Sequence, residues 1–232
     1  MSANDDGAAR LAEHALRLVE NGQVLGLGTG RAATAFVRVL ATRVHAGLQV
    51  AGVSTSEATA QLAQQLGIRL VTLAEHPTLD LAVDGADEVD PRGDLIKGYG
   101  GALLREKIVA TAARRFVVLV GREKLVPVLG SRGRLPVEVL PFGAALCRDR
   151  LARLGLRPVV RTRGESPETT DNGNWIFDCG LEPIADPSGL DLAIRNIPGV
   201  VATGLFLGMA PTVLVEDGGR VEVRSGREGR AS

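Results

Sequence analysis

Four carboxylates follow one of the apolar segments of the chain: Asp84, Asp87, Glu88 and Asp90. Residues 79–83 predict a buried strand, and carboxylates at the end of such a strand are costly unless they bind a ligand or carry out chemistry. The spacing matches no calcium loop and no histidine joins it, which disfavours a divalent metal. A solvated acidic loop accounts for Glu88 and Asp90. A third, competing interpretation is that Asp84 and Asp87 bind sugar hydroxyls and transfer protons.

A second loop combines a lysine with glycines. Lys97 is followed by three glycines and a tyrosine over residues 98–101, and a helix is predicted over residues 102–113. The glycines let the backbone approach a ligand closely at a helix N-terminus, and Lys97 would place a positive charge where an oxyanion forms. Glu106 lies about one and a half turns into the helix. Taken alone, Glu106 and its two charged neighbours are explained as an ordinary charged helix face.

A glycine turn, GLGTG at residues 26–30, stands between a predicted strand at 24–27 and a predicted helix at 32–44. The turn lacks the third glycine of a dinucleotide fingerprint, because Arg31 stands there, and it lacks the Gly-Lys-Ser/Thr of a P-loop. What remains is a helix N-terminus whose backbone N–H groups suit a single phosphate. A tight turn without a ligand would need the same glycines, so both interpretations stay open.

Hydroxyl side chains gather after the next predicted strand, at residues 50–53. Ser54, Thr55 and Ser56 could donate hydrogen bonds to a phosphate. Ser54 also has capping-box spacing with Glu57 for the helix that follows. The capping role accounts for Ser54 without any ligand.

Strands that alternate with helices must position these loops. Strands are predicted over residues 24–27, 50–53, 68–72, 79–83 and 116–120, and helices over residues 8–20, 32–44 and 102–113, with one more helix ending at residue 66. This alternation indicates a Rossmann-like, mostly parallel sheet that is covered on both faces. Ligands of such sheets bind beyond the carboxyl ends of the strands, which is where the four loops stand.

The order of elements changes near Pro127. Strands at residues 137–140, 158–163, 175–178 and 200–205, with helices at 144–154 and 190–195, follow the ferredoxin-like order βαββαβ. Residues 212–216 and 221–223 predict a hairpin that rejoins the first domain. The expected fold class is therefore α/β: a Rossmann-like, mostly parallel sheet domain (1–127 and 205–232) with a smaller α+β, ferredoxin-like domain (128–204).

Composition narrows the class of protein. Lys and Arg together number 27, as do Asp and Glu, so the chain lacks the basic excess of proteins that bind nucleic acid or membrane surfaces. No apolar run approaches the roughly 20 residues that span a bilayer, and the acidic N-terminus does not match a signal peptide. Cys147 and Cys179 form no metal-binding or disulfide pattern. We expect a cytoplasmic protein that binds neither nucleic acid nor membrane.

Seven segments together resemble one family, ribose-5-phosphate isomerase of type A. They run in order over about residues 20–210: GLGTG (26–30), STSEAT (54–59), VDGADEVD (83–90), IKGYGGALLREKIVA (96–110), LPVEVLPF (135–142), TDNGNWIFD (170–178) and IPGVVATGLF (197–206). The third and fourth segments are far more specific than any glycine loop. The resemblance implies an aldose–ketose isomerase that interconverts D-ribose 5-phosphate and D-ribulose 5-phosphate in the non-oxidative pentose phosphate pathway.

The resemblance also implies roles for matched positions. Glu106 is similar to the family's catalytic base, which moves a proton between C1 and C2 through an enediolate. Asp84, Asp87 and Lys97 resemble the polar groups around that base. The implied substrate-binding residues are Thr29, Gly30, Arg31, Ala32, Ser54, Thr55, Gly85, Ala86, Gly98, Tyr99, Gly100 and Lys124. The family implies no metal and no cofactor, a sugar phosphate as substrate, and a homodimer or homotetramer.

The chain departs from the family's pattern at two loops. Gly-Ser-Thr is replaced by Gly30-Arg31-Ala32, which loses two hydroxyls, and Tyr99 replaces a glycine. We hypothesise that Arg31 supplies a charged fork for the phosphate instead. Two other functions compete with this one: a non-catalytic sugar-phosphate sensor on the same fold, which would not require Glu106, and a nucleotide-dependent oxidoreductase, which the failed fingerprint disfavours. We expect Leu103, Leu104 and Ile108 to bury the Glu106 carboxylate.

Overall fold

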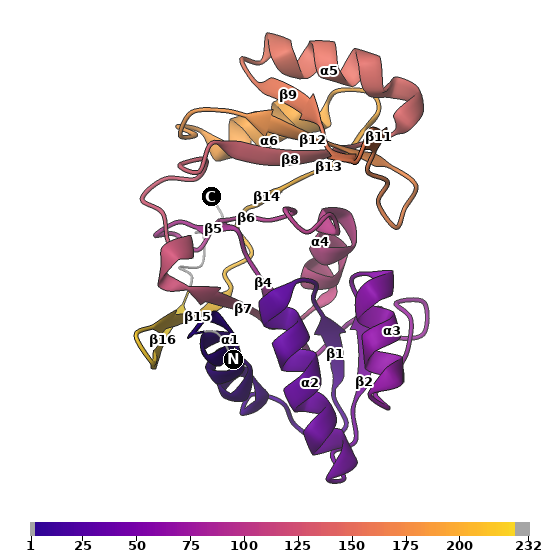
Figure 1. Ribbon diagram of the computed structural model, residues 1–232, viewed down its shortest axis with the longest axis vertical. Coiled ribbons are helices and arrows are strands. Elements are labelled where there is room, and N and C mark those ends of the chain that lie inside the picture. The colour runs from indigo at the N-terminus through magenta and orange to yellow at the C-terminus, as the bar shows by residue number, and fades with distance from the viewer. Residues whose placement is uncertain (1–2, 226–232) are drawn as a thin grey trace. The chain divides into compact units, whose positions relative to one another are not determined.

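The computed structural model describes residues 3–225, and the side chains of residues 5–225 (Figure 1). The chain divides into two compact units. The first comprises the residues up to Ala86, Arg105–Leu125 and the residues from Gly208 on; the second comprises Asp87–Leu104 and Val126–Leu207. The expected domains stay a prediction, and the two units differ from them in placing residues 87–104, 126–127 and 205–207 with the second unit.

A seven-stranded sheet forms the centre of the first unit. Its order is β16-β15-β7-β4-β1-β2-β3, made by β1 (Val24–Leu27), β2 (Ala51–Ser54), β3 (Arg69–Leu70), β4 (Leu81–Gly85), β7 (Phe116–Gly121), β15 (Thr212–Asp217) and β16 (Arg220–Ser225). Every neighbouring pair is parallel except the β15–β16 hairpin. The prediction that this hairpin joins the parallel sheet is confirmed, through the pairing of β15 with β7.

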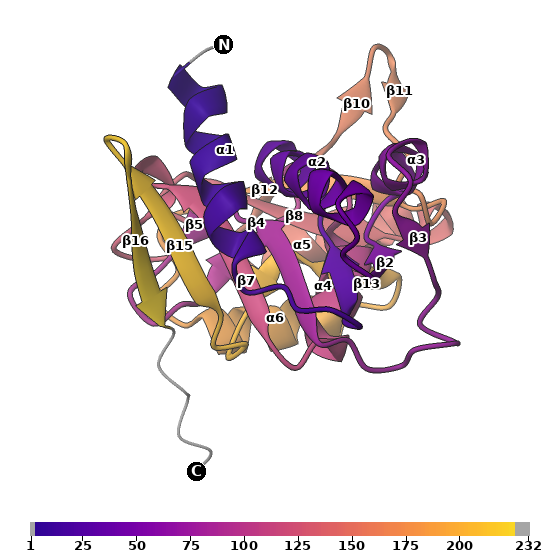
Figure 2. The ribbon, with the colours of Figure 1, turned by 90° about the horizontal axis from the view of Figure 1, so that it is seen from below.

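Helices cover both faces of this sheet. Helices α1 (Ala3–Leu16), α2 (Arg31–His45) and α3 (Glu57–Gln65) lie on one face, where Phe36 of α2 is buried with Leu25 and Leu27 of β1 (Figure 2). Helix α4 (Leu103–Ala112) lies on the other face: a Cβ at Gly26 of β1 would approach Val109 of α4 to 2.4 Å. Alternation along β1 therefore points Leu25 and Leu27 to one layer of helices and Gly26 to the other.

The second unit contains a four-stranded antiparallel sheet with two helices. Its elements are β8 (Arg134–Val139), α5 (Ala144–Arg153), β9 (Arg157–Val160), β12 (Trp175–Gly180), α6 (Pro187–Arg195) and β13 (Val200–Thr203). The sheet order is β13-β8-β12-β9, with every pair antiparallel. This order of elements confirms the predicted ferredoxin-like motif. Its core includes Cys147 and Cys179, and burial raises the pKa of the Cys179 thiol to about 12.

Shorter elements complete the second unit and the links. They are the hairpin β10 (Thr162–Arg163) and β11 (Ser166–Pro167), the three-stranded sheet of β5 (Glu88–Val89), β6 (Leu95–Ile96) and β14 (Leu205–Phe206), and the 3-10 turns η1 (Arg122–Lys124) and η2 (Pro141–Gly143). The single strand expected over residues 158–163 is divided into β9 and β10. Strands of two residues carry too little periodicity to be predicted from sequence.

The cap of α3 differs from the expected one. Ser54 is still paired with Leu27 in the parallel ladder of β2 with β1. The N-cap is Ser56, whose Oγ accepts a hydrogen bond from the Thr59 N–H at 3.1 Å. The predicted capping box of Ser54 and Glu57 is therefore wrong, because the strand extends one residue further than expected.

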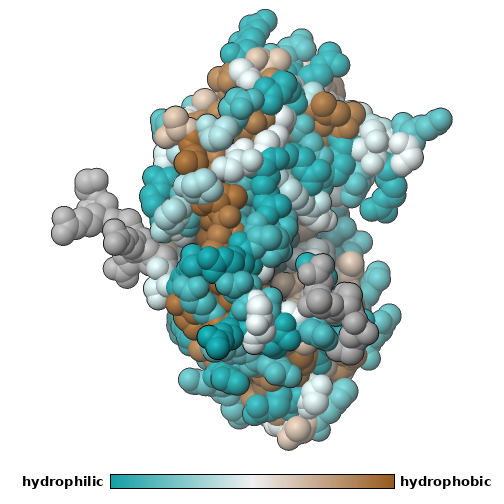
Figure 3. All heavy atoms as spheres, turned by 60° about the vertical axis from the view of Figure 1, so that its left-hand side comes forward, coloured by the Kyte–Doolittle hydropathy of each residue, from teal (hydrophilic) through white to brown (hydrophobic). Residues whose placement is uncertain are grey.

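Several large apolar side chains are exposed on the second unit. Phe142 of η2 is 99% exposed, and Leu140 and Leu146 close to it in sequence are each 47% exposed. On the face drawn in Figure 3, brown hydrophobic patches lie among the teal hydrophilic residues. Within the described residues, no helix combines the length and the apolar character that a membrane crossing requires.

Candidate functional site

The strand order of the first unit reverses at β1 and β4. From β1 the chain proceeds outward to β2 and β3, whereas β4 returns to the opposite side of β1. A crevice forms at such a switch point, outside the carboxyl ends of the strands, and is the usual ligand site of open α/β sheets. The glycine turn that follows β1 and the acidic residues that end β4 lie at this edge.

Hydroxyl groups converge on Thr29 at this edge. The Thr29 Oγ1 lies 2.7 Å from Thr55 Oγ1, 2.8 Å from Ser56 Oγ and 3.4 Å from Thr59 Oγ1. Thr55, Ser56 and Thr59 are all at most 6% exposed. Thr59 also donates to the Gly28 carbonyl at 2.9 Å, so these hydroxyls hold the glycine turn in shape. Sequence reasoning did not single out Thr59, although it lies in the STSEAT segment.

Asp84 is fixed by backbone N–H groups. Its Oδ1 accepts hydrogen bonds from Thr29 N–H at 3.1 Å and from Gly85 N–H at 2.7 Å, and its exposed fraction is 3%. A Cβ at Gly28 would lie 2.3 Å from the Asp84 Cγ, so a side chain there would displace the carboxylate. Glycine at position 28 is therefore required by the close approach of Asp84.

The N-terminus of α2 follows the same turn. Gly30 is its N-cap residue and has φ of 98°, in the left-handed region that favours glycine. No side chain caps this end, so the first-turn N–H groups of the helix are not engaged by the N-cap residue. Arg31, the first helical residue, is exposed, and Ala32 is half-buried. The arrangement is one that suits an anion.

Other predicted residues of the first unit lie at the ends of neighbouring strands. Ser54 ends β2 and is half-buried, while Gly85 and Ala86 stand at the end of β4 and are also half-buried. Lys124 lies on η1, directly after β7, and is half-buried. Because β7, β4, β1 and β2 are parallel neighbours, these residues share the carboxyl edge of the sheet.

Glu106 lies on the buried face of α4. Its exposed fraction is 4%, and Val109, one turn later on the same face, packs on Gly26 of β1. The end of α4 lies at the amino end of β4, where the Leu79 N–H donates to the Ala112 carbonyl. The first turns of α4 therefore lie toward the carboxyl ends of the strands. Glu106 therefore lies in the half of α4 that is nearer the carboxyl edge of the sheet.

The expected apolar surroundings of Glu106 need one correction. Leu103 is fully buried, as expected, and Leu104 is half-buried, but Ile108 is 45% exposed. Residues two apart do not share a helix face, so Ile108 points away from Glu106. Val109 and Ala110, three and four residues on, take its place in the buried face.

The second unit carries Asp87 and Tyr99. The Asp87 Oδ2 accepts a hydrogen bond from the Tyr99 N–H at 2.9 Å. The Tyr99 hydroxyl donates to the Arg134 carbonyl at 3.1 Å, and the Arg134 guanidinium lies 3.8 Å from the centre of the Tyr99 ring. Burial raises the pKa of Tyr99, and the negative charge of Glu88 raises it further. The tyrosine that departs from the family's glycine pattern is therefore anchored at both ends.

Lys97 begins the glycine loop of the second unit. Lys97 is 3% exposed, its N–H donates to the Gly204 carbonyl at 2.9 Å, and its Nζ lies 5.5 Å from the centre of the Phe206 ring. Gly98 has φ of 109°, and a Cβ there would lie 2.9 Å from Leu103. A Cβ at Gly100 would meet nothing within 4 Å. The loop is thus crowded at its start and open at Gly100.

The expectation of a solvated acidic loop at Glu88 and Asp90 is wrong. Glu88 is fully buried and accepts hydrogen bonds from the Gly130 N–H at 2.7 Å and the Arg132 N–H at 2.8 Å. Asp90 is 8% exposed and accepts from the backbone N–H groups of residues 92 and 94. Both carboxylates hold loops together, because backbone N–H groups satisfy their charge.

The predicted site residues therefore form two groups, one in each unit. The first group is Thr29, Gly30, Arg31, Ala32, Ser54, Thr55, Asp84, Gly85, Ala86, Glu106 and Lys124, and the second is Asp87, Lys97, Gly98, Tyr99 and Gly100. That the two groups serve one substrate stays a prediction. Among the described residues, no three or more His, Cys, Asp or Glu side chains gather as ligands for a metal ion.

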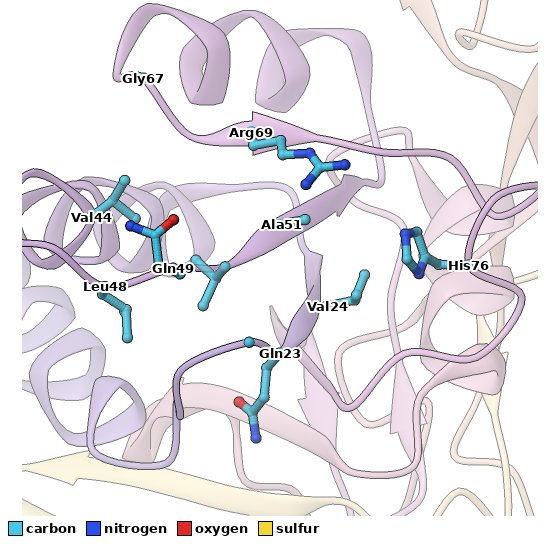
Figure 4. A pocket seen from close by; sticks show the side chains of 11 residues that line it. Gln23, Val24, Val44, Leu48, Gln49, Ala51, Gly67, Arg69 and His76 are labelled. Carbon is cyan, nitrogen blue, oxygen red and sulfur yellow. The ribbon is translucent and has the colours of Figure 1, made fainter.

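A cavity of about 370 Å³ lies elsewhere in the first unit (Figure 4). Gln23, Gln49, Arg69 and His76 contribute its polar side chains. Its walls come from the starts of β1 and β2, at the amino edge of the sheet and opposite the loops described above. Since ligands of such sheets bind at the carboxyl edge, the cavity is not the candidate site.

The fold and the site define a doubly wound α/β protein with acidic, hydroxyl and glycine loops at the ligand-binding edge of its sheet. A family described as ribose 5-phosphate isomerase A (phosphoriboisomerase A) matches residues 51–219. A ribose-5-phosphate isomerase A of Roseiflexus castenholzii is 56% identical over 209 residues, covering 89% of each chain. The chain belongs to the ribose 5-phosphate isomerase A family.

Solved structures agree with this assignment. A ribose 5-phosphate isomerase A from Methanocaldococcus jannaschii is 41% identical, with a TM-score of 0.91 over 96% of this chain and 100% of that one. A D-ribose-5-phosphate isomerase in complex with phospho-erythronic acid is 34% identical, with a TM-score of 0.92 over 97% and 100% of the two chains. The predicted family and fold class are confirmed.

Proposed function

We propose that this chain interconverts D-ribose 5-phosphate and D-ribulose 5-phosphate, with Glu106 as the base. The observation that carries the proposal is the Glu106 carboxylate, only 4% exposed on the sheet-facing side of α4, in the half of that helix nearer the carboxyl edge that also holds Asp84. Membership of the isomerase family supports the reaction. A buried base next to a polar edge is what proton abstraction beside a carbonyl requires.

The chemistry starts from the opened aldose, whose carbonyl is at C1. The Glu106 carboxylate removes the C2 hydrogen as a proton, and the C–H electron pair forms the C1–C2 double bond of an enediolate whose negative charge rests on O1. The protonated Glu106 then returns the proton to C1, while the O2 hydroxyl proton passes to O1, which leaves the carbonyl at C2. Lys97 and the glycine-loop N–H groups would stabilise the developing oxyanion.

The two aspartates suit the steps before proton transfer. Asp84 and Asp87 are three residues apart, so their Cα atoms lie within about 10 Å of each other. Each accepts a hydrogen bond from a backbone N–H of a glycine-containing loop: Asp84 from Thr29, and Asp87 from Tyr99. Their carboxylate oxygens could also accept hydrogen bonds from sugar hydroxyls. Either carboxyl group could then assist ring opening as a general acid or base.

The phosphate would bind at the start of α2. The first-turn N–H groups after the glycine N-cap and the exposed Arg31 guanidinium supply donors there, while the Thr29 hydroxyl shapes the turn by donating to Ser56. Lys124 adds a positive charge at the same edge. The related isomerase that was solved with phospho-erythronic acid, a phosphorylated sugar acid, supports a site for this class of ligand.

Arg31 offers a direct test of the phosphate site. Arg31→Ala should raise the KM for ribose 5-phosphate about tenfold, the size of a charge-assisted hydrogen bond, and leave kcat nearly unchanged. The exposed Arg38, about two helical turns further along the same helix, provides a matched control in Arg38→Ala. An unchanged KM in Arg31→Ala would dispose of the role.

We further propose that the protein works in the cytoplasm, without a metal or cofactor, as a homodimer or homotetramer. The exposed Phe142 and its apolar neighbours support self-association, since apolar surface of this kind is commonly covered by a partner.

The decisive assay for the function is isomerisation of several aldose phosphates in the presence of a chelator. We expect turnover of ribose 5-phosphate at a rate that the chelator does not change. Binding of ribose 5-phosphate without turnover would instead make the chain a sensor, and preference for another aldose phosphate would reject the proposed substrate.

A further inference from the structure

Arg161 lies within the second unit, in the link between β9 and β10. Its side chain is 11% exposed. Nε and Nη2 donate to the two carboxylate oxygens of Asp178 on β12, at 2.9 and 2.6 Å. Nη1 donates to the carbonyls of Gly98 and Tyr99, at 3.1 and 3.2 Å. One guanidinium thus joins a strand of the antiparallel sheet to the glycine loop after Lys97.

The two carbonyls that Arg161 contacts fix the direction of two peptide units. In a trans peptide the N–H points opposite to the C=O of the same unit. The N–H groups of Tyr99 and Gly100 therefore point away from the guanidinium. The Tyr99 N–H reaches Asp87 at 2.9 Å, and a Cβ added at Gly100 would meet no atom within 4 Å. Contact with a cation also polarises both units and makes their N–H groups better donors.

The loop needs such an external constraint. Gly98 and Gly101 have φ of 109° and 87°, and glycines without side chains restrict the backbone least. The loop's own hydrogen bond, from the Gly101 N–H to the Gly98 carbonyl, is 3.1 Å long. Arg161 adds two charge-assisted bonds at the same turn, at 3.1 and 3.2 Å.

Asp178 orients the arginine. The paired contacts to Nε and Nη2 set the plane of the guanidinium, which leaves Nη1 directed at the loop. Asp178 also lies 3.6 Å from the Nε of Arg134, whose guanidinium stacks on the Tyr99 ring. A cross-strand ion pair alone would account for Nε and Nη2, but it would not account for the two contacts of Nη1.

We propose that Arg161, oriented by Asp178, is a positioning residue that holds residues 97–101 in the form needed for catalysis. It keeps the Gly100 N–H directed to the ligand side, beside Lys97, and keeps the Tyr99 N–H on Asp87. The inference rests on the proposed isomerase function, because the group to be stabilised is the enediolate oxygen. Its effect would fall on kcat, since the oxyanion exists only after proton abstraction.

The experiment compares Arg161→Ala and Arg161→Lys with the control Arg163→Ala. Arg163 is two residues away, and its side chain is 83% exposed. Hydrogen exchange of the peptide that spans residues 97–101 should speed up about tenfold or more in Arg161→Ala, and kcat should fall by a similar factor with KM changed less than about threefold. Arg161→Lys should be intermediate, because a single ammonium cannot serve Asp178 and both carbonyls. The control should match the wild type.

Unchanged exchange of the 97–101 peptide in Arg161→Ala would overturn the proposal, as would faster exchange with unchanged kcat. If Arg161→Ala does not fold, the same two measurements, hydrogen exchange of residues 97–101 and kcat, are made on Asp178→Asn and Arg161→Lys. A wild-type protein that fails to turn over ribose 5-phosphate would reject the proposed function, whereas the exchange result would still decide whether Arg161 holds the loop.

Discussion

Asp84 meets the glycine turn after β1 at a distance that leaves no room for a side chain. The carboxylate accepts hydrogen bonds from the Thr29 and Gly85 N–H groups, so its orientation is set before a ligand binds. The same contact brings its Cγ to within 2.3 Å of where a Cβ of residue 28 would stand. At the scale of single residues, Gly28 is therefore a condition for the placement of Asp84.

Gly28→Ala should lower kcat/KM by at least about tenfold, because a displacement of about 1 Å near reacting groups can cost roughly 100-fold. Steady-state kinetics with ribose 5-phosphate measures the effect. Gly143→Ala is a suitable control, since a Cβ at Gly143 would meet its nearest atom at 3.6 Å, an ordinary contact. Equal activity of Gly28→Ala and the wild type would show that Asp84 need not stay in place.

Sequence reasoning succeeded for residues whose partners are close in the chain or follow a motif. It failed for Glu88, because the N–H groups that satisfy this carboxylate belong to residues 130 and 132, more than 40 positions away. It also missed Arg161, whose partners Gly98 and Asp178 come from two distant segments. Local patterns carry no information about such pairings.

At the scale of elements, β8 and the loop before β12 depend on a buried carboxylate. Glu138 of β8 is fully buried, and its Oε1 accepts hydrogen bonds from Thr170, Asn172 and Asn174 at 3.0, 3.2 and 2.9 Å. Its Oε2 has no hydrogen-bond partner within the part of the chain that the structure describes. One oxygen atom therefore organises the turn that leads into β12.

Glu138→Ala should lower the free energy of unfolding by about 2–4 kcal/mol, because it leaves the buried Asn174 amide without its acceptor. Glu138→Gln keeps an acceptor oxygen at the same place and should cost about 1 kcal/mol or less. Urea unfolding of both variants measures the difference. A loss below about 0.5 kcal/mol in Glu138→Ala would mean that the loop holds its shape without this carboxylate.

The elements themselves were the most predictable part of the chain. The run Val24–Leu27 is a strand as expected, and the ferredoxin-like order followed from alternating apolar residues and turn signals. Ends were less predictable: the first helix begins at Ala3, with Asp5 and Asp6 in its first turn, and ends at Leu16, not at residue 20. Acidic residues near a helix N-terminus favour the earlier start.

At the scale of the whole molecule, equal numbers of acidic and basic residues leave no net charge to keep copies apart. We expect the proposed self-association to centre on an exposed aromatic side chain. Phe142 is 99% exposed, with Leu140 and Leu146 near it in sequence. Aromatic residues of this kind often contribute most of the binding energy of an interface.

Phe142→Ser should weaken the proposed self-association about tenfold or more, measured by sedimentation over a range of protein concentrations. Val223→Ser, which removes a 52% exposed valine from β16 in the other unit, serves as the control. Identical association of Phe142→Ser and the wild type would place any interface elsewhere.

The most direct test of the central claim is Glu106→Gln, measured by isomerisation kinetics and by calorimetric binding of ribose 5-phosphate. The account predicts that the variant folds and binds the sugar phosphate but loses at least about 100-fold in kcat, the usual contribution of a general base. Glu13→Gln, at an exposed position of α1, should behave as the wild type. A Glu106→Gln enzyme within tenfold of the wild-type kcat would contradict the account, because another group would then be moving the proton.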